Sequence, residues 1–130
     1  MKNLYKALFQ FQQDCPVIKK NTKGYNYLYA DLPAVVEAIK PVLKKCGLGY
    51  TQVMNDKSLV TMLFHVESGE TMQSSFILPE TPLQGMNIYQ SLGAGITYFR
   101  RYELCCILGV IGDDDKDAND IKDEKEDDFI

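Results

Sequence analysis

The chain has 130 residues, of which 45% are hydrophobic and 25% are charged, and this composition predicts one globular domain with a modest core. No apolar run reaches the roughly 20 residues of a membrane-spanning helix. The segment after Met1 is amphipathic rather than a signal peptide, so we expect a cytoplasmic protein. Four cysteines without CxxC spacing (Cys15, Cys46, Cys105 and Cys106) and a single histidine argue against a disulfide framework and a zinc site.

The formal net charge of −4 averages two unlike parts of the chain. Residues 1–112 contain 11 basic and eight acidic side chains, whereas residues 113–130 contain three lysines and ten acids. The net charges of the two parts are therefore +3 and −7. We expect a mildly basic folded domain over residues 1–112 and an acidic, disordered tail over residues 113–130.

The first predicted element is an amphipathic helix. Helical spacing relates the apolar residues Leu4, Ala7, Leu8 and Phe11. Cys15 and Pro16 end this helix, because the residue before a proline disfavours helical backbone. Tyr5 and Phe9 add apolar surface, which we assign to the core or to a subunit contact.

A basic and aromatic segment follows. Lys19, Lys20 and Lys23 occupy a polar turn that leads into a predicted strand. Along this strand Tyr25, Tyr27 and Tyr29 alternate and share one face. Cations for phosphates beside rings for bases are typical of a single-strand nucleic-acid site. We favour DNA binding for the lysines; for the tyrosines, base stacking and burial in the core remain equal alternatives.

Residues 31–47 are predicted to form a second helix. Asp31 is a suitable cap, Pro33 lies in the first turn and Gly47 ends the helix. Pro41 is expected to kink the helix or to split it into two pieces.

Residues 48–54, 58–66 and 71–78 alternate in polarity and are separated by turn sequences, which predicts a three-stranded antiparallel meander. The predicted buried face carries Val60, Met62, Phe64, Val66, Met72, Phe76 and Leu78. The predicted wetter face carries Thr61, His65, Thr71, Gln73 and Ser75. No nucleophile or carboxylate pair accompanies His65, so we expect no catalytic residues.

The last predicted element is a long helix over residues 86–108. Its expected apolar stripe contains Ile88, Leu92, Phe99 and Cys106, with Ile96 and Tyr102 at the borders. Gly93, Thr97, Arg100 and Arg101 are expected to project to the other side. Two interior glycines cost about 1 kcal/mol each relative to alanine. Some contact should compensate this cost, and the small residues Gly93, Ala94 and Thr97 would let another backbone approach closely. That backbone is either protein or DNA beside the arginines. In the alternative, the helix packs on the sheet and the arginines are solvated. The resulting β-β-β-α order predicts an α+β fold in which this helix covers the meander.

Two sequence blocks resemble the Erf family of phage single-strand DNA annealing proteins ("essential recombination function"). One is the run Gly-Ala-Gly-Ile-Thr-Tyr-Phe-Arg-Arg-Tyr-Glu-Leu at residues 93–104, followed by Leu108-Gly109-Val110 and Asp113-Asp114-Asp115. The other is Lys-Gly-Tyr-Asn-Tyr-Leu-Tyr-Ala-Asp-Leu at residues 23–32. The resemblance covers roughly residues 1–119. It implies the core of the Rad-type annealing proteins, assembly into rings or helical filaments, and ATP-independent annealing of single-stranded DNA during recombination in a bacterial host cell.

The resemblance and the residue pattern together give a set of candidate contacts. The predicted DNA-binding residues are Lys19, Lys20, Lys23, Tyr25, Tyr27, Tyr98, Arg100 and Arg101. We expect the two arginines to contact phosphates. No glycine-lysine phosphate loop is present, which excludes an ATP-driven strand-exchange motor, and we expect neither a cofactor nor enzymatic activity.

The acidic segment has its own candidate roles. Asp113, Asp115, Asp117 and Glu124 match a calcium loop, but Ala118 replaces the required glycine, so we expect no metal site. Acids followed by Phe129 and Ile130 are similar to the tails by which bacterial single-strand binding proteins recruit partners. Three roles stay open for this tail: docking of a host replication protein, competition with DNA for the basic groove of its own subunit, and solubility alone. In the alternative function, the protein is an accessory module without annealing activity that recruits host replication or recombination proteins through this tail.

Overall fold

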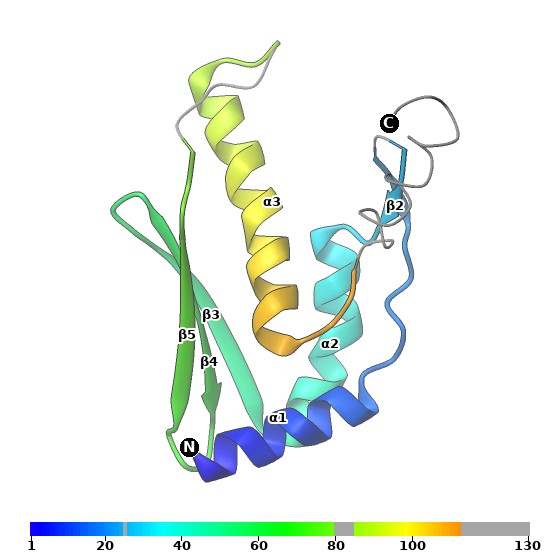
Figure 1. Ribbon diagram of the computed structural model, residues 1–130, viewed down its shortest axis with the longest axis vertical. Helices are drawn as coiled ribbons and strands as arrows, with labels where there is room; N and C mark the ends of the chain where they lie inside the picture. The colour runs from blue at the N-terminus through cyan, green and yellow to red at the C-terminus, as the bar shows by residue number, and fades with distance from the viewer. Residues whose placement is uncertain (25, 80–84, 113–130) are drawn as a thin grey trace, which may run out of the picture.

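The structure, a computed structural model, describes residues 1–24, 26–79 and 85–112 (Figure 1). Its elements in chain order are α1 (Lys2–Asp14), β1 (Thr22–Lys23), β2 (Leu28–Tyr29), α2 (Leu32–Cys46), β3 (Leu48–Asn55), β4 (Ser58–His65), β5 (Thr71–Ile77) and α3 (Ile88–Leu108). The predicted α+β class is confirmed, and each strand of the meander begins and ends within one residue of its predicted bounds.

The long helix α3 lies between the β3-β4-β5 sheet and α2, and α1 crosses the end of this arrangement (Figure 1). The core lies where these elements meet. Its fully buried side chains include Leu4 and Phe11 of α1, Val35 and Ile39 of α2, and Leu63 of β4. Tyr5 and Phe9 of α1 face away from this core and are more than half exposed.

Local signals explain the helix ends. The Asp31 side chain accepts a hydrogen bond from the Ala34 N–H (3.0 Å), and α2 ends at Gly47 with a left-handed φ of 71°. In α3, Asn87 and Gln90 accept hydrogen bonds from each other's backbone N–H groups, which forms a capping box. The expected split of α2 at Pro41 is wrong. One helix continues through this proline, because buried residues on both sides of it pack into the same core.

The predicted buried face of the sheet is correct for Met72 and Phe76 of β5, which lie opposite Leu63 and Leu59, and for buried Leu78, but it is wrong for β4. The register places Leu59, Thr61 and Leu63 on one face of β4, and all three are buried beneath the helices. Val60, Met62 and Phe64 therefore point outward, together with half-exposed Val53 of β3 and more exposed Ile77 of β5. β4 is apolar on both faces, so its alternation did not decide between them. Thr61 donates a hydrogen bond to Glu103 of α3 and accepts one from Gln52 of β3, so the face with this polar residue can be buried.

The apolar stripe predicted for α3 is only partly correct. Phe99 stacks on Phe76 of β5, with ring centroids 4.3 Å apart. Ile88 and Leu92 are 62% and 50% exposed, and Cys106 is exposed as well. The buried residues of α3 are Ser91, Arg101, Glu103, Leu104, Ile107 and Leu108. Most of them lie in the second half of α3, because the sheet and α2 enclose mainly that half.

A carboxylate attaches α1 to the sheet. Glu70, just before β5, accepts hydrogen bonds from the Leu4 backbone N–H (2.7 Å) and from the Asn3 side chain (3.0 Å). The hydrogen bond from Leu4 is the main cause that lowers the pKa of Glu70 below its ordinary value. The ionised carboxylate therefore stabilises the first turn of α1.

Candidate nucleic-acid interface

The two sequence blocks predicted to bind DNA meet in space and line one cavity of about 440 Å³. We call this cavity the tyrosine pocket. Its lining residues are Tyr27, Tyr29, Asp31, Leu32, Gly93, Ala94, Thr97, Tyr98 and Arg101. One wall comes from the β1-β2 hairpin and the start of α2, and the other comes from the middle of α3. Some 60 residues separate the two blocks in sequence, so only the tertiary fold brings them together.

The β1-β2 hairpin presents two tyrosines to the pocket. Tyr27 and Tyr29 lie on the same face of the hairpin, with ring centroids 5.7 Å apart. A Cβ atom added at Gly24 would lie 2.8 Å from the Tyr27 ring, so only glycine permits this ring position. The Gly24 N–H also donates a hydrogen bond to the Tyr27 carbonyl oxygen (2.8 Å). Tyr25 lies outside the described residues.

The hairpin separates its lysine from its tyrosines. Lys23 is directly opposite Leu28, and Thr22 is directly opposite Tyr29. Directly opposite residues share a face of an antiparallel pair, so Lys23 points away from the face that carries Tyr29. Lys23 therefore does not line the tyrosine pocket.

Arg101 is a buried part of the pocket wall. Its side chain is 3% exposed, and its guanidinium carbon lies 4.5 Å from the ring centroid of Tyr29, 4.7 Å from that of Tyr102 and 5.6 Å from that of Tyr98. A guanidinium on aromatic faces at these distances gives favourable cation–π interactions. Arg101 thus connects the ring from β2 with two rings from α3.

Arg100 points to the sheet instead. Its Nε donates a hydrogen bond to Gln52 Oε1 of β3 (3.1 Å), and Gln52 Nε2 donates to the Arg100 carbonyl oxygen (3.0 Å). The expectation that both arginines project together from the free side of the helix is therefore wrong. Adjacent residues of a helix differ by about 100° in direction, and α3 has neighbours on both sides.

A buried carboxylate that sequence reasoning missed continues this contact. Gln52 Nε2 also donates to Thr61 Oγ1 (2.9 Å), and the Thr61 hydroxyl donates to Glu103 Oε1 (2.8 Å). The Ser74 hydroxyl donates to the other oxygen of Glu103 (3.2 Å). Alternating polar residues in β3, β4 and β5 were the available signal. These bonds fix the rotation of α3 on the sheet and so determine which of its residues face the tyrosine pocket.

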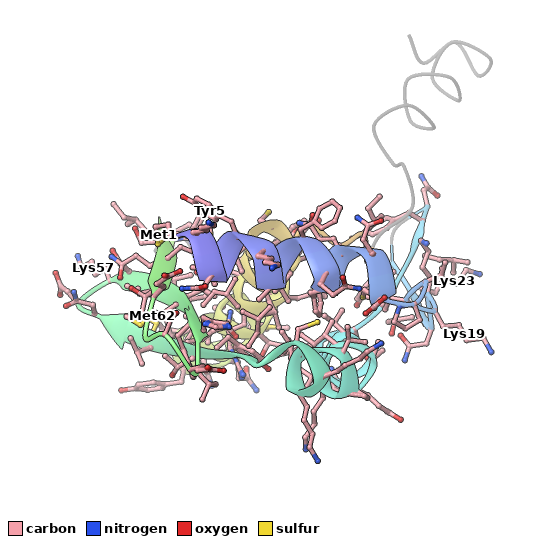
Figure 2. All side chains as sticks on the ribbon, turned by 90° about the horizontal axis from the view of Figure 1, so that it is seen from below. Met1, Tyr5, Lys19, Lys23, Lys57 and Met62 are labelled. Atoms are coloured by element: carbon pink, nitrogen blue, oxygen red, sulfur yellow. The ribbon has the colours of Figure 1, made fainter. Side chains whose placement is uncertain are left out.

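The predicted lysines lie around the pocket rather than in it. Figure 2 shows Lys19 and Lys23 at the same end of the molecule, opposite Lys57, and both are exposed. Lys20 lines a different hollow, with Gln12, Cys15, Gly109 and Ile111 among its neighbours. The structure therefore brings together Tyr27, Tyr98 and Arg101 from the predicted set, and leaves the lysines and Arg100 outside the pocket.

Two further features limit the chemistry of the described residues. Within them, no group of three or more histidine, cysteine, aspartate or glutamate side chains is arranged to hold a metal ion. None of their helices has both the length and the apolar character of a membrane crossing. The predicted tail at 113–130, with Phe129 and Ile130, lies outside the part of the chain that the structure describes.

Comparisons with known proteins agree with the sequence resemblance. Residues 4–128 match the model of the ERF superfamily. The chain is 28% identical over 125 residues to the essential recombination function protein of Salmonella phage P22. The match covers 91% of this chain and 60% of the phage protein, so the chain spans less than two thirds of that relative. No solved structure matches the chain.

Proposed function

Because the chain belongs to the ERF superfamily, we propose that it is a recombination protein that binds single-stranded DNA and anneals complementary strands without ATP. Its proposed place of action is the cytoplasm of a bacterial host cell. The protein would hold one strand, keep it extended and present bases to a second strand for pairing, with no covalent step.

One observation carries the proposal: the two blocks that resemble the family form one surface. Tyr27 and Tyr29 come from the first block, Tyr98 and Arg101 come from the second, and all four line the tyrosine pocket. A cluster of aromatic rings beside cations is the arrangement by which many proteins bind single strands. If the two blocks had only structural roles, no open cavity would be needed between them, so the cavity favours a binding role.

The lysines are proposed to supply affinity that does not depend on sequence. Lys19 and Lys23 are exposed at the end of the molecule that carries the β1-β2 hairpin (Figure 2). Lys20 and Arg100 remain proposed phosphate contacts on the flanks of the same region, and Tyr25 remains a proposed stacking residue. Phosphates bound here would leave the bases free to turn toward the rings or toward a second strand.

We propose that the protein acts as an oligomer, either a ring or a filament. The outward face of the sheet supports this, because Val60, Met62 and Phe64 form its centre and no described element covers them. The outer edges of β3 and β5 also have no partner strand among the described residues. Apolar sheet faces and open edges are the surfaces that other subunits commonly cover.

Annealing of two complementary, fluorescently labelled oligonucleotides tests the proposal directly. In buffer without nucleotide, the wild-type protein should accelerate annealing, and added ATP should change nothing. Tyr98→Leu should lose most of this acceleration, while Tyr89→Leu is the matched control. Tyr89 lies on the same helix, is 81% exposed and does not line the tyrosine pocket.

Two results would contradict the proposal. A folded wild-type protein that leaves the annealing rate unchanged would favour the alternative of an accessory interaction module. If the Tyr98 and Tyr89 variants lose the same share of the annealing rate, annealing does not depend on the tyrosine pocket.

A further inference from the structure

The tyrosine pocket has the size and lining of a site for a small flat molecule. Its volume of about 440 Å³ is within the range of roughly 300–1,000 Å³ that ligand sites occupy. Aromatic rings from β2 and α3 face it, and small residues of α3 form the wall between them. We infer, on the basis of the proposed DNA binding, that one nucleobase turned out of the bound strand enters this pocket and packs on the tyrosine rings.

The glycine in the pocket wall supports an outside occupant. A Cβ atom added at Gly93 meets no described atom within 4 Å, so no described part of the chain uses the missing side chain. A glycine inside a helix is destabilising relative to alanine. The open space beside Gly93 belongs to the pocket, and the small residues Gly93, Ala94 and Thr97 leave room for a base to lie close to the helix.

The charges of the pocket favour a base over a phosphate. The Asp31 carboxylate is part of the lining and repels an anion. Arg101 is the cation of the lining, but its guanidinium lies against the rings of Tyr29, Tyr98 and Tyr102 and is almost fully buried. A base is neutral, and each of the four bases has a flat π face that can stack on tyrosine.

Arg101 acts in this arrangement as a positioning residue. Its guanidinium contacts Tyr29 from the first block and Tyr98 from the second, and so sets the distance between the two walls. Phosphates on either side of the inserted base would lie outside, toward the lysines. The pocket therefore accepts any of the four bases, and it anchors the strand at one base per subunit.

An oligonucleotide that lacks bases tests the inference. The full-length protein is titrated with an oligothymidylate and with an abasic deoxyribose-phosphate oligomer of the same length and charge. Base stacking on an aromatic ring predicts about tenfold or more weaker binding of the abasic oligomer, with similar salt dependence for both. Equal affinity for the two oligomers would overturn the inference and leave the proposed DNA binding intact.

Two glycines of α3 provide a matched pair of variants. Gly93→Leu fills the pocket, and the affinity for oligothymidylate should fall to that for the abasic oligomer, whose own affinity stays unchanged. Gly95→Leu is the control, because Gly95 also has open space around it among the described residues but does not line the pocket. Equal selective losses in both variants would also overturn the inference.

Folding of the variants is checked by circular dichroism. If Gly93→Leu does not fold, Tyr98→Leu replaces it, since Tyr98 lines the pocket and is 44% exposed. Failure of the wild-type protein to bind either oligomer would refute the proposed function itself, and the inference with it. Arg101→Lys should bind DNA more tightly than Arg101→Ala but more weakly than the wild type, because an ammonium cannot lie flat against several rings.

Discussion

The buried carboxylate of Glu103 should be a major determinant of stability. It accepts hydrogen bonds from Thr61 at 2.8 Å and from Ser74 at 3.2 Å, and it is 7% exposed. A hydrogen bond to a charged group contributes about 1.5–3 kcal/mol. The bond to Thr61 is fully buried and the bond to Ser74 only partly, so Glu103→Leu should lower the free energy of unfolding by about 3–4 kcal/mol. That is a large fraction of a typical stability of about 5–15 kcal/mol.

Urea unfolding of a double-mutant cycle measures this effect. Thr61→Val removes the hydroxyl that Glu103→Leu leaves without its acceptor, so the double variant should lose less stability than the two single variants added together. Glu67→Ala, in the exposed turn after β4, is the control and should change little. Additive losses in the cycle, or an unchanged midpoint for Glu103→Leu, would refute the hydrogen-bond network as the feature that holds α3 on the sheet.

The pKa of Glu70 is lowered mainly by the Leu4 N–H, so its contribution to stability is complete above its ordinary pKa of about 4.5 and is lost as the pH falls through the lower folded pKa. The difference in thermal midpoint between wild type and Glu70→Gln should therefore be full near neutral pH and vanish in acid; a difference that does not change with pH contradicts this. Met62→Lys places a charge on the outward face of the sheet and should reduce the mass measured by light scattering without unfolding the protein, whereas an unchanged mass excludes this face as a subunit contact. Lys23→Ala should lower the salt dependence of single-strand binding by about 0.7 in log–log slope, while Lys57→Ala, at the opposite end, should leave the slope unchanged; equal slopes for both would remove Lys23 from the interface.

The sequence predicted the elements well, but it predicted the buried faces of β4 and α3 poorly. Turn residues and alternation located the three strands within one residue, because these signals are local. The buried face of β4 was predicted incorrectly, since Leu59, Val60, Met62 and Leu63 make both faces apolar. The face that is buried depends on tertiary contacts such as that of Thr61 with Glu103, 42 residues later.

The candidate site shows the same limit. The residue types of both blocks indicated DNA binding, and the resemblance located them along the chain. The burial of Arg101 depends on Tyr29, 72 residues earlier, and no periodicity within α3 indicates that contact. Helical spacing alone therefore predicted that Arg100 and Arg101 project from the same side of α3, although Arg100 contacts the sheet and Arg101 contacts Tyr29.

We propose that single-stranded DNA lies on the surface formed jointly by residues 23–32 and 93–102. Photo-crosslinking of an oligonucleotide that contains 5-iodouracil, followed by mass spectrometry of the peptides, locates the bound bases, because the photoproduct forms with rings in contact with the base. We expect crosslinks to Tyr27, Tyr29 or Tyr98, and their loss in the presence of excess unlabelled single-stranded DNA. Crosslinks confined to exposed Tyr5 and Phe9 of α1, or to the outward face of the sheet, would contradict it.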